Sequence, residues 1–497
     1  HGAAALAAYV VTAVWTRLVS DLGLVGAAGR ATTCAMATAV RSTSLLERRF
    51  ALSERGTTVR TEAIGGLSTF LTMSYILFVN PAILSAAGVP TTGVIVATAL
   101  SAAIATAAMA LAANLPFALA PGLGLNAVVA FEIVLGHRLP WQVGMACIVL
   151  EGLLALILVI AGLREAVVRA VPNSLKLAIG VGIGLFITLV GLREGGIVVN
   201  NPATGIALAD LSAGPPLIAL AGIFTAAALS VRHVRGALLI GILVSAALGL
   251  IFGVMDAPTK VADWPGQAGF STIGDALDPK WIGDALTLAL IPTIFALFMT
   301  DFFDTVGTAV AVGTAGGLVD ERGEVPNLRR LLLVDSGAAA MGGAMGASSV
   351  TTYVESGAGV SEGARTGLAS LVTAGLFLIA IPFVPLIAVV GQQVPYVDKT
   401  FISPAVAPAL VLVGYLMMRL VAAIDWNDPV SALPAFLVIA GVPLTFSIAA
   451  GIGLGVIGYV VAMIVTGQVR RIHPVMWVLV PLFLAYFADD WLAAHVF

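Results

Sequence analysis

Charged side chains are scarce in this sequence. Asp, Glu, Lys and Arg make up 10% of its 497 residues, whereas an ordinary soluble domain carries about 25%. Hydrophobic residues make up 59%, and the mean hydropathy is +1.05. Because so few charges cannot cover a water-facing surface, a soluble enzyme and a disordered protein are excluded. The 24 basic and 27 acidic residues leave no cationic excess, which excludes a nucleic-acid-binding protein.

Cysteine and histidine are also rare. The two cysteines, Cys34 and Cys147, cannot form a disulfide scaffold or a thiolate metal site, and we expect no cofactor. His137, His233 and His473 fall in the loops between apolar runs, so a histidine proton relay is not expected. By contrast, 54 glycines and 24 prolines accompany the apolar residues. That composition predicts closely packed and sometimes broken helices, and thus an all-α polytopic membrane protein.

Apolar runs long enough to cross a bilayer recur along the whole chain, since a spanning helix needs about 20 mostly apolar residues. Two further stretches, 117–136 and 348–361, are broken by glycine and polar residues, and counting both predicts fourteen crossings. The twelve continuous runs are 64–80, 93–113, 141–162, 174–192, 215–230, 236–255, 284–300, 331–347, 366–390, 402–420, 432–447 and 449–466.

The basic residues orient these crossings, because Lys and Arg collect in cytoplasmic loops. With the N-terminus inside, 19 of the 24 basic residues fall in cytoplasmic segments. A random distribution would divide them almost evenly. The pattern therefore predicts that both termini are cytoplasmic. The five basic residues placed outside are Arg138, Arg193, Lys260, Lys280 and Lys399.

The two broken stretches are the third and tenth crossings, and each is third in a block of seven. Since seven is odd, the second block enters the membrane from the opposite side, as in an inverted-topology repeat. We therefore expect a first repeat over 47–256 and a second over 284–467. Residues 1–46 are expected to form a peripheral extension. The tail 468–497 is expected to be interfacial, with a short helix near 475–488.

Both broken stretches predict a short strand followed by a half-helix. Pro121 ends an extended segment before the glycines, and 349–354 carries the threonines and valines of a strand. Two such strands, paired antiparallel, would satisfy each other's backbones inside the bilayer. The half-helices would then bring Asn126 and Glu355 to the midplane, where discontinuous helices of transporters hold their ligands.

Acidic residues inside apolar runs indicate function, because each costs about 2.5–3.5 kcal/mol to insert. Asp301 and Asp304 lie three residues apart on one helix face, where two ionised carboxylates would repel each other. A proton bound by one of them relieves that repulsion, which makes the pair a candidate proton carrier. A sodium or metal site and a structural hydrogen-bonded pair remain alternatives. Glu132 and Glu151 are expected near span ends, with local partners or water.

The predicted site combines carboxylates, an amide and backbone donors, with no Lys or Arg inside the same spans. Such a site suits a neutral, hydrogen-bonding ligand, since an anion would need a cation nearby. The neighbouring Phe302 and Phe303 are candidates to face a flat ring, although core or lipid contacts are commoner for phenylalanine.

Several motifs resemble the AzgA-like adenine/guanine/hypoxanthine permeases, a branch of the nucleobase/cation symporters and of the xanthine/uracil permease superfamily. The resemblance covers roughly residues 45–485. The matching stretches are Glu54–Glu62, Phe70–Pro81, Ala120–Asn126, Asp301–Thr308, Val334–Ser336 and Ser348–Gly367.

The resemblance implies fourteen helices in two inverted repeats, with a core domain from crossings 1–4 and 8–11 and a gate domain from 5–7 and 12–14. It implies a secondary active transporter of the bacterial inner membrane that imports purine nucleobases by proton symport. Asn126, Asp301 and Glu355 would be the essential positions for substrate and coupling, with Asp301 and Glu355 carrying the proton. Asp304 would contribute to purine affinity, and a homodimer through the gate domain is compatible with this fold.

Other functions remain open at this stage. A uracil or xanthine carrier of the same fold is the nearest alternative, although the Asp301–Asp304 pair favours the purine branch. A membrane enzyme would need a nucleophile and a base, and a channel would need symmetric filter segments; neither pattern is present. The preferred purine, and sodium in place of the proton, are not decided by these residues.

Overall fold

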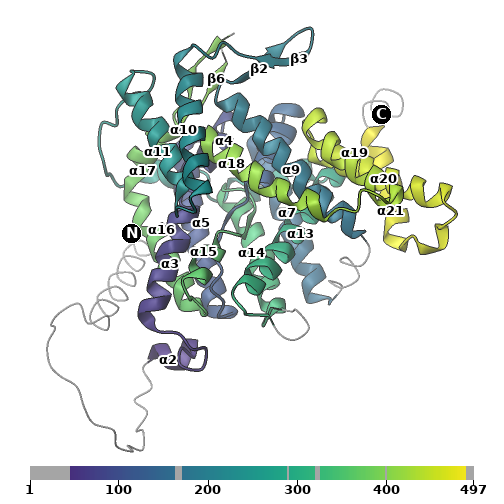
Figure 1. Ribbon diagram of the computed structural model, residues 1–497, viewed down its shortest axis with the longest axis horizontal. Helices are drawn as coiled ribbons and strands as arrows, with labels where there is room; N and C mark the ends of the chain where they lie inside the picture. The colour runs from purple at the N-terminus through teal and green to yellow at the C-terminus, as the bar shows by residue number, and fades with distance from the viewer. Residues whose placement is uncertain (1–44, 163–170, 288–289, 320–324, 398–399, 489–497) are drawn as a thin grey trace, which may run out of the picture.

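The computed structural model describes residues 45–162, 171–287, 290–319, 325–397 and 400–488, and these residues are mostly helical (Figure 1). Most of the predicted N-terminal extension, 1–46, lies outside the described residues. Only its end is seen, where the short helix α2 (Leu45–Phe50) begins.

Helices make up most of both halves of the chain. The first half contains α3 (Val59–Met73), α4 (Ile76–Ala86), α5 (Thr91–Ala112), α6 (Leu123–Ala127), the π-helix η1 (Val128–Gly136), α7 (Trp141–Ile160), α9 (Asn173–Glu194), α10 (Gly214–Val231) and α11 (Ala237–Ile251). The second half contains α12 (Pro279–Ala285), α13 (Ile291–Ala315), α14 (Leu328–Met345), α15 (Ser356–Ser361), α16 (Gly367–Ala380), α17 (Val384–Val390), α18 (Ala407–Met417), α19 (Pro429–Thr445), α20 (Ile448–Val465) and α21 (Pro474–Phe487).

Strands occur in three short antiparallel pairs. They are β1 (Leu119–Pro121) with β4 (Val350–Thr352), β2 (Val198–Asn201) with β3 (Gly205–Leu208), and β5 (Val394–Pro395) with β6 (Phe401–Ile402). The β2–β3 hairpin projects from one end of the helical body (Figure 1).

Eight helical segments in the described residues are long and apolar enough to cross a membrane. The first runs through both α3 and α4, and five further apolar helices are shorter, namely Leu123–Gly136, Ala237–Ile251, Ala407–Ala423, Pro429–Thr445 and Pro474–Phe487. The last coincides with the expected C-terminal helix near 475–488. The structure therefore supports a multi-pass membrane protein, while the count of fourteen crossings stays a prediction.

Two predicted spans have the wrong limits. The run 284–300 contains the end of α12, and the spanning helix α13 begins only at Ile291, with Pro292 in its first turn. Helix α13 continues to Ala315, so Asp301 and Asp304 lie inside it and not beyond its end. The run 402–420 starts with the last residue of β6, and α18 begins only at Ala407. Hydropathy detects apolar residues without detecting where the backbone becomes helical.

The predicted ribbon of two strands is present, and it joins the two halves of the chain. Leu119 pairs with Thr352, and Pro121 pairs with Val350. The outer edge of β1 is bonded by the Thr106 side chain, which accepts from Leu119 N at 2.9 Å and donates to Leu119 O at 3.0 Å. On the outer edge of β4, Thr352 N donates to the Asp335 carboxylate at 2.9 Å. The ribbon therefore lies in the protein interior with these edge groups bonded.

The helices pack into two sets around this ribbon. One set joins α3, α5 and α16, and α14 packs against both α5 and α7. The other set joins α9 with α18 and α19, α19 with α20, and α10 with α11. Helix α13 contacts members of both sets, including α7 and α20.

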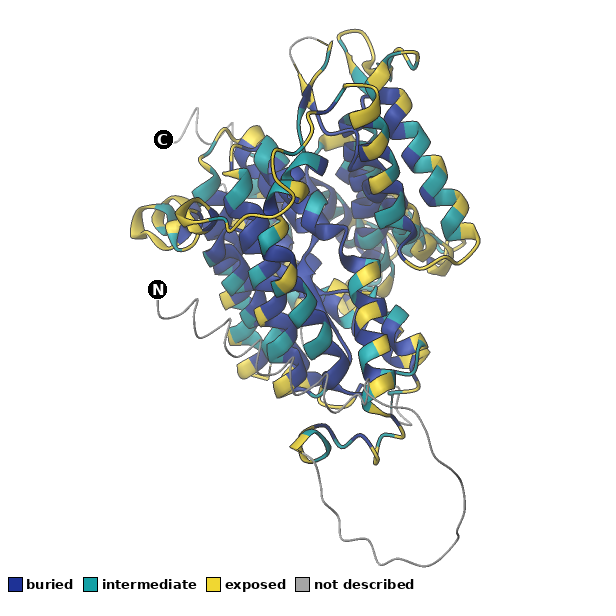
Figure 2. Cartoon of the chain, turned by 90° about the vertical axis from the view of Figure 1, so that its left-hand side faces the viewer, coloured by how far each residue is buried: buried dark blue, intermediate teal, exposed yellow. Residues whose placement is uncertain are grey.

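Many large apolar side chains remain exposed on the outside of the bundle, where a bilayer would cover them. Examples are Phe224, Ile251, Leu444 and Val465, which are 68%, 73%, 82% and 80% exposed. Figure 2 shows the buried residues in the middle of the bundle and the exposed ones at its periphery. Such an apolar surface is typical of a lipid-facing protein.

Replacing Gly152 on α7 with alanine should destabilise the contact between α7 and α14. A Cβ at this position would lie 2.4 Å from Ala340 N and 2.9 Å from Ala340 Cα, which is too close for either backbone to accommodate. Overpacking of this kind costs about 1–3 kcal/mol. We expect Gly152→Ala to lower the midpoint of thermal unfolding in detergent.

Gly337 on α14 provides the matched control. A Cβ there would meet nothing within 4 Å, so Gly337→Ala should keep or raise the unfolding midpoint, since alanine is the better helix former. Equal midpoints for the two variants would contradict the close approach of α7 and α14.

Candidate functional site

Glu355 lies between the ribbon and the half-helix α15, and it has a close partner from another element. Tyr75 Oη donates to Glu355 Oε1 at 2.6 Å, and Thr72 Oγ1 lies 3.4 Å from the Glu355 carbonyl oxygen. Tyr75 occupies the break between α3 and α4 and is buried. Tyr75 was not among the predicted site residues, although it belongs to the Phe70–Pro81 motif.

Asp304 on α13 and Glu355 form the accessible part of the candidate site. Asp304 is exposed and Glu355 is half-buried. The two carboxylates interact electrostatically, and Asp335 is a further electrostatic neighbour of Asp304. The structure therefore makes two of the four predicted site residues electrostatic neighbours, both with exposed surface.

Asp301 lies on the same helix but is buried, with 2% of its surface exposed. Ser349 Oγ, next to β4, lies 3.4 Å from Asp301 Oδ1 and 2.8 Å from Glu151 Oε1. Glu151 is the eleventh of the 20 residues of α7 and is fully buried. The prediction that Glu151 lies near a span end is therefore wrong, and its hydrogen-bond partner Ser349 comes from the segment just before β4.

Asn126 lies on α6, the half-helix that follows β1, and is fully buried. Among the residues that the structure describes, neither atom of its side-chain amide has a hydrogen-bond partner. A buried amide without partners costs stability. Asn126 is thus a polar group with unused hydrogen-bonding capacity at the end of the first half-helix.

Asp335 on α14 is a structural carboxylate. Its Oδ1 accepts from Thr352 N at 2.9 Å and Thr352 Oγ1 at 2.8 Å, and its Oδ2 accepts from Thr305 Oγ1 at 2.7 Å. These three bonds fix β4 between α13 and α14. An ionised carboxylate with three donors is well accommodated in a buried site.

Glu132 is also buried, and the partners that the structure shows are distant along the chain and not local as expected. It lies on the π-helix η1, accepts from Ser447 Oγ at 2.8 Å and Ile448 N at 2.9 Å, and is 3.5 Å from the Tyr486 hydroxyl. Since Ser447 and Ile448 begin α20, Glu132 caps that helix from another element. π-Helices are rare and often lie at functional sites.

The two phenylalanines beside the acids have different surroundings. Phe302 is buried in the core. Phe303 is half-buried, and the ammonium of Lys176 on α9 lies 5.3 Å from its ring centroid. Lys176 approaches from α9, a different helix from those that carry the acids, and its contact is with the aromatic ring.

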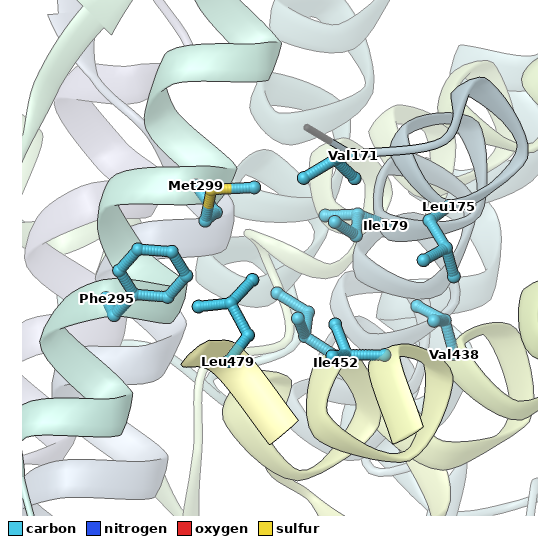
Figure 3. Close-up of a pocket in the computed structure, with 9 residues that line it drawn as sticks. Val171, Leu175, Ile179, Phe295, Met299, Val438, Ile452 and Leu479 are labelled. Carbon is cyan, nitrogen blue, oxygen red and sulfur yellow. The ribbon is translucent and has the colours of Figure 1, made fainter. Parts of the chain in front are cut away.

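A small apolar pocket lies beside the same helix α13 but carries no polar chemistry (Figure 3). Phe295 and Met299 of α13 face Val171 and Leu479 there, and the accessible volume is about 10 Å³. That volume is near the minimum for one water molecule. Within the described ranges, no group of three His, Cys, Asp or Glu side chains is arranged to hold a metal ion.

The predicted residues thus fall into two layers. Asp304 and Glu355 form an accessible layer, and Asp301 is buried behind it with Glu151 and Ser349. Asn126 is buried at the other half-helix. Tyr75, Glu151 and Ser349 were missed as site residues because their partners are 280, 198 and 48 residues away along the chain.

Comparison with known proteins assigns this chain to a family. The chain matches the Permease family of xanthine and uracil permeases over residues 60–478. It is 41% identical over 450 residues to the guanine/hypoxanthine permease PbuG of Bacillus subtilis, covering 88% of this chain and 98% of that protein. It is 40% identical over 446 residues to the adenine permease AdeP of Escherichia coli, covering 88% and 95%.

Solved structures share the fold at low sequence identity. The transmembrane domain of the cyanobacterial bicarbonate transporter BicA has a TM-score of 0.56 at 16% identity, covering 79% of this chain and 97% of that one. The murine anion transporter Slc26a9 in its inward-facing state has a TM-score of 0.59 at 12% identity, covering 88% and 77%. The fold is therefore that of membrane transporters, and the chain belongs to the xanthine/uracil permease family.

Proposed function

We propose that this permease imports purine nucleobases (adenine, guanine or hypoxanthine) by proton symport across the bacterial inner membrane. The observation that carries the proposal is the accessible pair of carboxylates, Asp304 and Glu355, beside the ribbon that joins the two broken segments. The named relatives, which are guanine/hypoxanthine and adenine permeases, support a purine as the substrate.

Purine chemistry suits these side chains. A purine presents ring N–H and amino donors next to ring nitrogen and carbonyl acceptors. Carboxylate oxygens of Asp304 and Glu355 accept from the donors, and a protonated carboxyl donates to an acceptor. The Asn126 amide supplies both a donor and an acceptor. A site built to satisfy such groups rejects analogues that leave its polar atoms unpaired.

The proposed architecture has fourteen crossings in two inverted repeats, with core and gate domains. The two sets of packed helices support it, since α3, α5, α7, α14 and α16 form one set and α9, α10, α11, α18, α19 and α20 form the other. Contacts that link the sets include the Glu132 cap on α20, an ion pair between Arg235 and Glu362, and the packing of α11 against α3.

Transport then proceeds by movement of the core set against the gate set. An external proton and a purine bind the core, with Glu355 and Asp301 as the coupling carboxylates. The core moves relative to the gate, and the site opens to the cytoplasm, where both termini lie. Such alternating access is usual for carriers built from inverted repeats.

Competition of labelled adenine uptake by unlabelled guanine, hypoxanthine, uracil and xanthine tests the substrate class. We expect guanine and hypoxanthine to compete with adenine, and uracil and xanthine to compete only weakly. We also expect adenine to accumulate against its concentration gradient without chemical change. Competition by uracil or xanthine alone would favour a carrier for those bases. Uptake without accumulation would favour a channel, and chemical alteration of adenine would favour an enzyme.

Replacing Glu355 with glutamine should abolish or uncouple uptake. The amide still accepts from Tyr75 but cannot bind and release a proton. Tyr75→Phe, which removes only the 2.6 Å hydrogen bond, should weaken affinity and keep proton coupling. The measurement is labelled adenine uptake with and without an imposed proton gradient, and normal proton-driven uptake by the glutamine variant would refute the role of Glu355.

Replacing Asp304 with alanine should raise KM for the purine more than it changes the coupling. Loss of one hydrogen bond to a charged group, worth about 1.5–3 kcal/mol, predicts an increase of about ten- to a hundredfold. Asp263→Asn in the exposed loop, where Asp263 pairs with Lys260, is the matched control and should leave KM unchanged. An unchanged KM in Asp304→Ala would remove Asp304 from the site.

A further inference from the structure

One buried carboxylate has no place in the function described so far. Glu151 lies in the middle of α7, is fully buried, and has one oxygen, Oε2, without a hydrogen-bond partner in the described part of the chain. Its other oxygen is bonded by Ser349, the residue that also faces Asp301. A group this costly to bury inside a membrane segment indicates function.

The Ser349 hydroxyl lies between the two carboxylates. Ser349 has a single hydroxyl hydrogen, and Glu151 Oε1 at 2.8 Å is nearer than Asp301 Oδ1 at 3.4 Å. When that hydrogen is directed to Glu151, Ser349 Oγ can accept a hydrogen from Asp301.

A proton on Asp301 completes this chain of hydrogen bonds. With the Ser349 hydrogen directed to Glu151, Asp301 can bond Ser349 Oγ only by donating a proton of its own. The charged groups that interact with Asp301 are Glu151, Asp335 and Asp304, all of them acidic. Glu151 in turn has Asp335 as a charged neighbour besides Asp301. Because these neighbours are all acidic, one proton bound by the Glu151–Asp301 pair removes one of the pair's two buried negative charges.

We propose that Glu151 is a proton-coupling residue of the carrier, which exchanges one proton with Asp301 through the Ser349 hydroxyl. In this step the Asp301 O–H gives its proton to Ser349 Oγ, and the Ser349 O–H gives its hydrogen to Glu151 Oε1. Asp301 becomes a carboxylate and Glu151 becomes an acid. The pair keeps one proton and one negative charge throughout, while the proton moves from α13 to α7.

The inference rests on the proposed proton symport, and it assigns Glu151 to coupling and not to purine recognition. Glu151 is buried behind the accessible layer of Asp304 and Glu355, and its hydrogen bond goes to Ser349. Removing its acidity should therefore separate two activities of the carrier. Purine exchange, which needs the binding site alone, should persist, and accumulation driven by protons should stop.

The test uses the full chain reconstituted in liposomes that contain a pH-sensitive dye. In Glu151→Gln, the amide oxygen still accepts from Ser349, but no proton can be carried. We expect exchange of labelled for unlabelled purine at the wild-type rate, an accumulation ratio of one under an inward proton gradient, and no purine-dependent acidification. Glu151→Asp, which restores a carboxylate, should recover part of the accumulation.

Two further variants keep the proposal testable if Glu151→Gln fails to fold. Ser349→Ala keeps both carboxylates but removes the bridging hydroxyl, and it should also lose accumulation while it retains exchange. Glu194→Gln neutralises a buried glutamate outside the pair, at the end of α9, where Glu194 accepts from Ser403 N at 3.0 Å, and should keep proton-driven accumulation. Thermal unfolding midpoints, measured for every variant, separate folding defects from loss of coupling.

The outcomes divide clearly. Full accumulation in Glu151→Gln or in Ser349→Ala overturns the proposal, as does a folded Glu151→Gln protein that has lost exchange, because Glu151 would then act on the purine. Loss of accumulation in Glu194→Gln overturns it too, since the effect would not be specific to the pair. A wild-type protein that moves purine without protons would instead refute the proposed symport.

Discussion

Backbone groups inside a bilayer must find their partners within the protein, and the candidate site is built around that requirement. The strands Leu119–Pro121 and Val350–Thr352 bond each other, and Thr106 and Asp335 bond groups on their outer edges. Because these groups are satisfied, the chain can leave the helical conformation at membrane depth. Each strand then leads into a short helix, and these two interruptions give Asn126 and Glu355 positions that a continuous helix would not offer.

The sequence predicted this central feature because its signals are local. Pro121 and the glycines after it interrupt one apolar run, and threonines and valine interrupt the other. The partners of the acids could not be predicted in the same way. Tyr75 reaches Glu355, and Ser349 reaches Glu151, only through packing of distant segments. The central position of Glu151 in its span could have been predicted, since the run 141–162 centres on it. Hydropathy does not tell, however, which neighbour a residue on that run will face.

Buried acids in this protein differ by the donors that they receive. Glu62 accepts from the backbone N–H groups of Arg365, Thr366 and Ala369 at the start of α16, and Asp335 accepts three hydrogen bonds at the ribbon. The hydrogen bonds of such carboxylates hold elements of the fold together. In the described part of the chain, Glu151 has one oxygen without a partner, and its other oxygen shares the single Ser349 hydroxyl with Asp301. Residue type and depth alone do not separate these roles, whereas the count of donors does.

The pairing of β1 with β4 also has a consequence for biogenesis. The two strands are separated by more than two hundred residues, and each lacks its partner until the other has entered the membrane. During synthesis the first half must therefore keep Leu119–Pro121 near water, the insertion machinery or a temporary helical form. Neither half can reach its final structure as an independent unit, so the two halves complete their insertion together, and a chain divided between them would assemble only when both pieces are made in the same cell.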